Sequence, residues 1–193
     1  MHQIVENFNK IIVKLPELTA VLVELNSTDI KYGLYAGSHV AILTSNRIPT
    51  DVDFLVADED FAKLINLFPL AQVKNSGNAK FLYVGTNNDI EFMSFADVNI
   101  DGSHYNFRLS DLVWENSSLL SGDNFKVRIL NEVDTILLKA MLQRGKELGK
   151  HDLEDIEAIL RTKTINKEYL SQRLVEVRQD ERLLSVLAKF KLV

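Results

Sequence analysis

The chain of 193 residues contains no cysteine. It can therefore form no disulfide framework, and it can build no metal site from thiolate ligands. No stretch of about eighteen apolar residues runs without charges, so we expect no transmembrane helix. The first ten residues, MHQIVENFNK, lack the basic and then apolar pattern of a signal peptide. These absences favour a cytoplasmic protein with no membrane partner.

Positive charge is the scarcer sign, because 22 Lys and Arg residues stand against 27 Asp and Glu residues, for a formal net charge of -5. This balance disfavours broad, sequence-independent binding to nucleic acid, although it leaves a local basic groove open. Six basic residues gather before the last predicted helices: Lys126, Arg128, Lys139, Arg144, Lys146 and Lys150. Either they face an anionic substrate or they form the solvated face of helices.

Hydrophobic residues make up 46% of the chain, enough for one substantial domain or a domain with a small appendage. Their periodicity predicts an α+β fold, in which a part with both strands and helices (residues 1–130) precedes a helical part (131–193). The predicted strands cover 32–35, 51–56, 81–84, 90–95 and 125–130, and the predicted helices cover 4–15, 18–25, 38–43, 61–67, 133–141, 153–160, 169–177 and 182–190. We expect Ser38 and Asp58 to cap the helices that follow them.

Two aspartates in the second predicted strand, Asp51 and Asp53, are the first candidates for chemistry. Side chains alternate along a strand, so both carboxylates point to one side while Val52 and Phe54 anchor the other side in the core. Carboxylates this close repel each other unless they are protonated or bridged by a cation. Oxygen ligands without sulfur favour a hard ion, Mg²⁺ first and Mn²⁺ second. A solvated strand end is the simpler explanation of such a pair on its own.

A later predicted strand offers a third acid. Asp89 and Glu91 share one face of that strand, opposite Ile90 and Phe92. Three clustered carboxylates can hold two ions about 4 Å apart, which stabilises both the attacking and the leaving oxygen of an in-line displacement. Glu91 is the better candidate because apolar residues flank it. Asp89 lies beside a turn, where an acid often has only a turn role.

The step from Gly37 to Ser38 precedes the aspartate pair and opens a predicted helix. Glycine lets the backbone approach a ligand closely, and a helix N-terminus favours phosphate. A tight turn with an ordinary N-cap is the alternative. We expect His39 to face solvent in the first helical turn. No two of the four histidines have the spacing of a zinc site.

These motifs resemble the signature of the nucleotidyltransferase superfamily whose best-known member is DNA polymerase β. Ala36 followed by Gly37-Ser38, and then by the strand 51–54, matches its small residue, Gly-Ser and acid-hydrophobic-acid-hydrophobic pattern. Arg47 and Thr50 are similar to a variant found in small bacterial members. The segments LKAMLQRGK (138–146) and KHDLEDI (150–156) resemble members related to abortive-infection toxins and the helical part of some antibiotic nucleotidyltransferases.

The resemblance implies a mixed β-sheet flanked by helices, and it implies a role for each group of site residues. The metal ligands and catalytic acids are Asp51, Asp53 and Glu91. The nucleotide-binding residues are Gly37, Ser38, Arg47 and Lys139. The residues that support the site or orient the helix are Arg144, Lys150, Asp152 and Asp155. For two of these residues a purely structural role stays open. Lys139 could belong to the polar face of its helix, and Asp152 could stabilise a helix start.

The implied activity is metal-dependent transfer of a nucleoside monophosphate from a nucleoside triphosphate, with ATP as the expected donor, to a hydroxyl acceptor. The acceptor stays open among an aminoglycoside-like small molecule, a protein side chain and an RNA end, which the sequence pI of about 5.4 disfavours. A toxin of a toxin–antitoxin pair is one enzymatic variant. The alternative from another class is a catalytically silent nucleotide-binding or protein-interaction module, such as an antitoxin. The presence of all three acids favours the enzyme.

Overall fold

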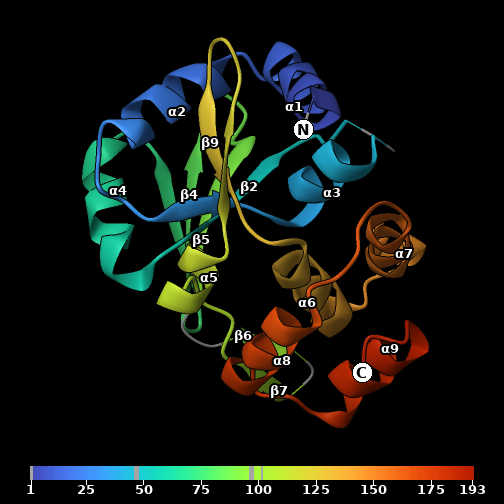
Figure 1. The fold of residues 1–193 in the computed structure, drawn as a ribbon. Helices are drawn as coiled ribbons and strands as arrows, with labels where there is room; N and C mark the ends of the chain where they lie inside the picture. The colour runs from blue at the N-terminus through green and yellow to red at the C-terminus, as the bar shows by residue number, and fades with distance from the viewer. Residues whose placement is uncertain (1, 46–47, 96–97, 101) are drawn as a thin grey trace.

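The computed structural model describes residues 2–45, 48–95, 98–100 and 102–193 (Figure 1). Its centre is a seven-stranded sheet with the strand order β3-β4-β5-β2-β1-β9-β8. These strands are β1 (Tyr32–Leu34), β2 (Val52–Val56), β3 (Gln72–Ser76), β4 (Ala79–Val84), β5 (Ile90–Phe95), β8 (Ser118–Ser121) and β9 (Lys126–Ile129). The strands β6 (Val98–Ile100) and β7 (Ser103–Tyr105) form a separate two-stranded sheet. The predicted α+β class is confirmed.

Two parallel pairings make the sheet mixed. β2 runs parallel to β5, and β1 runs parallel to β9, whereas the remaining neighbours are antiparallel. In the β2–β5 pair, Asp53 lies beside Glu91. The parallel direction brings the first residues of both strands to the same edge of the sheet. Acids that are far apart in the sequence therefore become neighbours.

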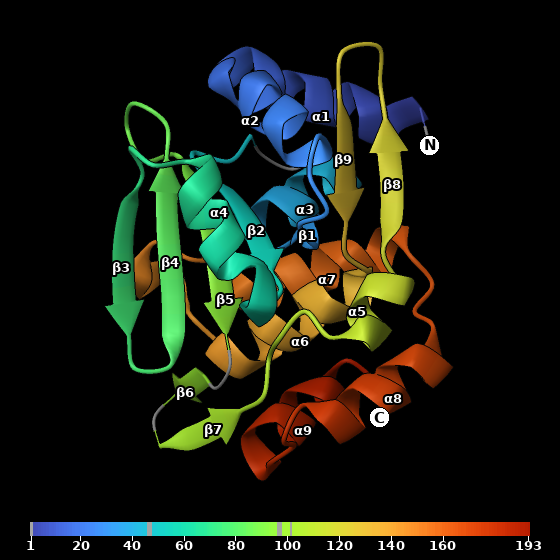
Figure 2. The same cartoon turned by 90° about the vertical axis from the view of Figure 1, so that its left-hand side faces the viewer.

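Helices cover both faces of the sheet (Figure 2). Their bounds are α1 (His2–Lys14), α2 (Glu17–Asn26), α3 (Ala36–Thr44), α4 (Phe61–Leu67), α5 (Asp111–Glu115), α6 (Glu132–Leu142), α7 (Asp152–Thr162), α8 (Lys167–Glu176) and α9 (Glu181–Lys189). Short 3₁₀ turns occupy 58–60 and 146–148. In Figure 2, α4 lies in front of the sheet and α6 and α7 lie behind it.

Strand alternation divides the core into two layers. On one face Phe54 and Phe92 stack at 5.2 Å, and they share an apolar cluster with α1, α2 and α4. On the other face Leu55 and Met93 join the apolar residues of α6 to α9. Asp53 has the same parity as Leu55, so its carboxylate lies on the face that meets α6. The core thus fixes which side of the sheet the acids occupy.

Two predicted caps are wrong. α3 begins at Ala36, before Ser38, and Tyr35 occupies its N-cap position. Asp58 opens a 3₁₀ turn, and its carboxylate accepts a hydrogen bond from the Ser94 hydroxyl instead of from a helix amide. In both cases a partner distant in the sequence binds the side chain that the local sequence would assign to capping.

The sequence prediction also misses the two edge strands, β3 and β8, and the short α5. Every residue of β3 is exposed, so its sequence QVKNS carries no alternation of apolar and polar residues. None of the helices in the described ranges is long and apolar enough to cross a membrane. The domain boundary between residues 130 and 131 stays a prediction.

Candidate active site

A cavity of about 540 Å³ lies where the start of α3, the strands β2 and β5, the helix α6 and the loop before α7 meet. Its polar lining comprises Thr50, Asp51, Asp53, Glu91, Lys139, Arg144, Lys150 and His151. Its apolar lining includes Tyr35, Phe81, Met93, Phe95, Leu138 and Leu142. The cavity therefore joins the segments that the sequence analysis singled out separately.

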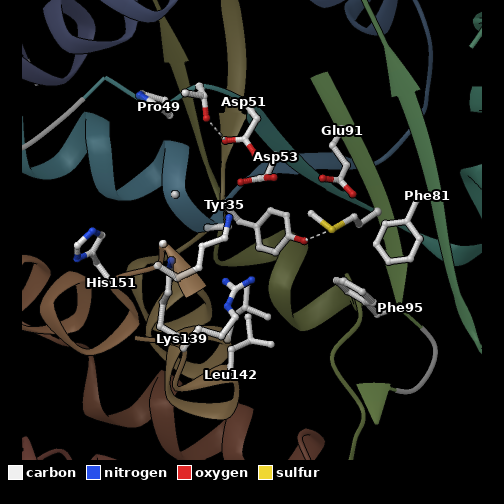
Figure 3. A pocket seen from close by; sticks show the side chains of 18 of the residues that line it. Tyr35, Pro49, Asp51, Asp53, Phe81, Glu91, Phe95, Lys139, Leu142 and His151 are labelled. Atoms are coloured by element: carbon white, nitrogen blue, oxygen red, sulfur yellow. Dashed lines mark hydrogen bonds between the residues drawn. The ribbon is translucent and has the colours of Figure 1, made fainter. Parts of the chain in front are cut away.

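The three predicted acids lie together at the top of this cavity (Figure 3). Asp51 directly precedes β2, Asp53 belongs to β2, and Glu91 is its register neighbour on β5. Val52 and Phe54 are both fully buried in the opposite layer. The strand is thus anchored by its apolar residues, and its carboxylates project into the cavity.

Burial and neighbouring negative charge both act on the acids of the site. Burial, followed by the charges of Asp51 and Glu91, raises the pKa of Asp53 to about 7, and the opposing charges of Lys139 and Lys150 do not cancel this shift. Burial also raises the pKa of Glu91, although a hydrogen bond with Tyr83 acts in the other direction. In the part of the chain that the structure describes, no three His, Asp or Glu side chains are placed as a group that could hold a metal ion. The site concentrates negative charge that a cation would neutralise.

The start of α3 faces the acids. Ala36 has a φ of 56°, in the left-handed region that a residue with a Cβ seldom adopts. The Tyr35 amide donates to the Asp53 carbonyl at 3.2 Å, and the His39 amide donates to the Tyr35 carbonyl at 3.3 Å. The amides between them belong to the open first turn, where anions bind. A Cβ on Gly37 would approach Asp53 Oδ2 to 3.9 Å, so this glycine faces the carboxylates.

Ser38 and His39 both point away from the cavity. The Ser38 hydroxyl is fully buried and donates to the Asp51 carbonyl at 2.9 Å, which ties α3 to the start of β2. The prediction of a solvent-facing His39 is wrong, because its side chain is buried and its Nδ1 lies 2.9 Å from Thr135 Oγ1. α6 covers this turn of α3, a contact that the local sequence does not reveal.

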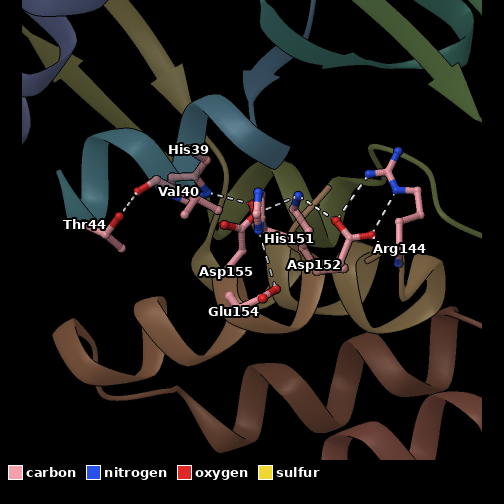
Figure 4. A network of polar contacts seen from close by, with 10 residues as sticks. His39, Val40, Thr44, Arg144, His151, Asp152, Glu154 and Asp155 are labelled. Atoms are coloured by element: carbon pink, nitrogen blue, oxygen red, sulfur yellow. Dashed lines mark hydrogen bonds and ion pairs between the residues drawn. The ribbon is translucent and has the colours of Figure 1, made fainter. Parts of the chain in front are cut away.

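A cluster of ion pairs holds two cationic lining residues of the cavity, Lys139 and Arg144. Figure 4 shows Arg144, Asp152 and Asp155 of this cluster. Lys139 Nζ lies 2.8 Å from Asp152 Oδ1 and 2.9 Å from Asp155 Oδ2. Arg144 Nε lies 2.9 Å from Asp152 Oδ2. Burial alone would raise the pKa of Asp152, but hydrogen bonds from Arg144 and Lys139 lower it below its usual value. Lys139 is 3% exposed, so its interpretation as part of a solvated helix face is wrong.

Most of the predicted site residues meet at this cavity. Gly37 and Lys139 line it together with the three acids, whereas Ser38 does not. Arg47 lies outside the residues that the structure describes. Asp89 is not among the lining residues, and its carbonyl accepts the Val52 amide at 2.7 Å.

The apolar part of the lining includes three residues that the sequence assigns only to strands. Phe81, Met93 and Phe95 all line the cavity. The sequence does contain a signal for two of them: Met93 and Phe95 follow Glu91 at even spacing in the strand, so their side chains share its face. Phe81 pairs with Met93 across β4 and β5, a register that the sequence alone does not fix.

Solved structures identify the fold. A nucleotidyltransferase-like antigenic protein from Paracoccidioides brasiliensis has a TM-score of 0.53 and 17% identity, over 89% of this chain and 84% of its own. ANT(2")-Ia in complex with adenylyl-2"-tobramycin has a TM-score of 0.54 and 8% identity, over 92% of this chain and 99% of its own. The chain has the nucleotidyltransferase fold. The predicted resemblance is confirmed at this level.

A third solved structure with the nucleotidyltransferase fold is the lincosamide antibiotic adenylyltransferase LnuA with lincomycin bound. It has a TM-score of 0.50 and 18% identity, over 77% of this chain and 97% of its own. No family model and no curated protein matches the sequence. The fold relationship therefore rests on structure, and the residues of the cavity must carry the functional argument.

Proposed function

We propose that the chain is a metal-dependent nucleotidyltransferase that moves a nucleoside monophosphate from a nucleoside triphosphate to a hydroxyl acceptor. The observation that carries this proposal is the meeting of three carboxylates with the N-terminus of α3 around one cavity. Carboxylates bind metal ions and accept protons, and helix amides bind phosphate. The nucleotidyltransferase fold supports this assignment of roles.

Asp51, Asp53 and Glu91 would hold the metal ion, Mg²⁺ or Mn²⁺. Their oxygen-only donor set fits a hard cation, and a bound cation would offset the burial and the neighbouring charges that raise the pKa of Asp53. The ion would supply charge stabilisation to the reacting phosphate. Within the described ranges no three carboxylate or imidazole side chains are placed to bind one metal ion together. Binding of the ion would therefore draw the three carboxylates toward one another.

The chain's own residues would position the two reactants for an in-line displacement. The first turn of α3 at Gly37 would hold the β- and γ-phosphates, and Glu91 would accept the proton of the acceptor hydroxyl. A bond forms between the acceptor oxygen and the α-phosphorus as the bond from that phosphorus to the bridging oxygen breaks. Pyrophosphate leaves with the electron pair of the broken bond.

Positive charge on the α6 side of the cavity would stabilise the departing pyrophosphate. Lys139 is fixed there by Asp152 and Asp155, while Lys150 is exposed and lines the cavity. We assign Ser38 a part through its backbone amide, because its hydroxyl is already bonded to the Asp51 carbonyl. A nucleotide contact from Arg47 stays a prediction from the sequence.

ATP is the donor that we propose, with a small hydroxyl compound as acceptor. LnuA is an adenylyltransferase with lincomycin bound, and ANT(2")-Ia carries adenylyl-2"-tobramycin. We favour a small molecule as the acceptor over a protein side chain or an RNA end. A toxin would use the same transfer reaction, and a neighbouring antitoxin gene would distinguish that role.

The direct test incubates the protein with Mg²⁺, ATP labelled at the α-phosphate and a metabolite extract. We expect labelled product from the wild type and a loss of at least about a hundredfold in Asp53→Asn, because the metal site loses a ligand. Asp89→Asn is the matched control, since this nearby acid does not line the cavity. Equal labelling in wild type and Asp53→Asn would overturn the proposed metal site.

One observation favours a second candidate, the catalytically silent binding module: the acids of the described chain do not converge as a metal-holding group. Such a module would still bind nucleotide at α3. It would gain thermal stability from Mg²⁺ and ATP in both wild type and Asp53→Asn, but it would label no product in either.

A further inference from the structure

We infer that the acceptor is an uncharged hydroxyl compound with an apolar or aromatic body, rather than a polycationic sugar. This inference rests on the proposed function and assigns the acceptor class from the part of the cavity that the nucleotide leaves free. It depends on two features of the cavity: the direction of the displacement and the character of the surface at its far end.

The direction follows from the positions of α3 and the acids. An in-line displacement places the attacking oxygen opposite the leaving pyrophosphate, with the α-phosphate between them. If pyrophosphate lies over α3 and the α-phosphate lies at the acids, the acceptor must approach from beyond Glu91. Figure 3 shows this arrangement: Phe81 and Phe95 lie on the side of Glu91 that faces away from Asp51.

The surface beyond Glu91 is apolar. It is formed by Phe81 of β4, Met93 and Phe95 of β5 and Val98 of β6, and Leu142 lines the opposite wall on α6. The rings of Phe81 and Phe95 meet edge to face at 5.9 Å, which fixes both against the sheet. Phe81, Val98 and Leu142 are half-buried, so part of their apolar surface faces the cavity.

The polar groups of this region are already engaged. The Tyr35 hydroxyl donates to the Met93 sulfur at 3.1 Å, and Tyr83 is hydrogen-bonded to Glu91. A hydroxyl compound would therefore find one polar partner, Glu91, surrounded by aromatic and aliphatic carbon. Burying an apolar body there is favourable, whereas burying an unpaired ammonium group is costly.

The charge of the lining argues against a polycation. Among the described residues that line the cavity, the only carboxylates are the three proposed catalytic acids. The other charged side chains there are cationic: Lys139 and Arg144, which Asp152 and Asp155 already pair, and Lys150. Lys74 also lies 4.7 Å from the Tyr83 ring centroid, beside Glu91's partner. An aminoglycoside would have to take the carboxylates that the metal requires.

The test compares two probes by calorimetry in the presence of Mg²⁺ and a non-hydrolysable α,β-methylene analogue of ATP. 4-Methylumbelliferone is a planar aromatic hydroxyl compound, and kanamycin is a polycationic sugar. We expect 4-methylumbelliferone to bind at least about tenfold more tightly than kanamycin. Phe81→Ser should weaken its binding by roughly tenfold, through loss of one aromatic contact.

Phe68→Ser is the matched control, because this half-buried phenylalanine stacks on Phe92 in the opposite layer, and it should change the affinity less than about twofold. Leu142→Ser tests the other wall and should weaken binding in the same direction as Phe81→Ser. Thermal stabilisation by the ATP analogue in each variant reports folding and nucleotide binding.

Two failures can be told apart. If the ATP analogue and Mg²⁺ do not stabilise the wild type, the proposed function fails. If they do, but kanamycin binds as tightly as 4-methylumbelliferone or 4-methylumbelliferone does not bind, the acceptor inference is overturned while the proposed function stands. Binding that neither Phe81→Ser nor Leu142→Ser weakens overturns the inference as well.

Discussion

His39 makes the stability of the protein depend on pH in a way that one substitution removes. Burial, followed by the positive charge of Lys163, lowers the pKa of its imidazole from 6.5 to about 3 in the folded protein. In the unfolded chain the ring regains its ordinary pKa of about 6.5. Between these two values the unfolded chain binds more protons than the folded one. The free energy of unfolding must therefore fall as the pH falls through this range.

The size of the effect follows from the two pKa values. The contribution of the neutral His39 ring to the free energy of unfolding is fully present above about pH 6.5 and is lost progressively toward about pH 3. Integrating the proton uptake from about pH 7 to about pH 5 gives a loss of about 2 kcal/mol from this one ring. That is a large share of the net stability of a typical domain, about 5–15 kcal/mol.

The assay is urea unfolding at both pH values, followed by circular dichroism. His39→Gln keeps a polar group for Thr135 but cannot titrate, so it should lose about 2 kcal/mol less than the wild type between the two pH values. His104→Gln, in the exposed part of β7, is the matched control and should lose as much as the wild type. Equal losses in wild type and His39→Gln would refute the reasoning.

Three further substitutions test other parts of the structure. Lys139→Met should lower the free energy of unfolding by about 3–5 kcal/mol in urea titrations, because it removes the cation between Asp152 and Asp155; a loss below about 1 kcal/mol would contradict the buried cluster. Gly37→Val should abolish thermal stabilisation by Mg²⁺ and ATP, because its side chain enters the cavity beside Asp53; an unchanged shift would mean that phosphate binds elsewhere. Ala36→Gly should leave the unfolding free energy unchanged or higher, because glycine relieves the left-handed φ; the loss of about 1 kcal/mol that an ordinary helical alanine shows would contradict this backbone geometry.

The local patterns of the sequence predict the central elements well. The strand predicted at 90–95 coincides with β5, and the strand predicted at 51–56 differs from β2 only at Asp51. Both strands are buried on one face or on both, so their apolar residues are dense and their acids stand out. Asp53 and Glu91 could be chosen for the same reason, because core residues flank both, and Asp51 could be chosen because it precedes Asp53 at strand spacing.

What the sequence could not provide are contacts between distant segments. Ser38 and His39 are ordinary first-turn residues by type, and only the contacts with Asp51 and Thr135 turn them inward. The partnership of Lys139 with Asp155 likewise depends on the packing of α6 against α7. The aromatic end of the cavity requires the register of β4 on β5, which the strand sequences leave undetermined.

The central claim is that the cavity between α3 and the acids transfers a nucleoside monophosphate. The most direct measurement follows two samples of ATP, one labelled at the α-phosphate and one at the γ-phosphate, in parallel reactions with Mg²⁺ and the same acceptor extract. We expect the product to carry the α-label and the γ-label to appear only in pyrophosphate, with both signals lost in Asp53→Asn. A product that carries the γ-label, or no labelled product from either sample, would contradict this claim.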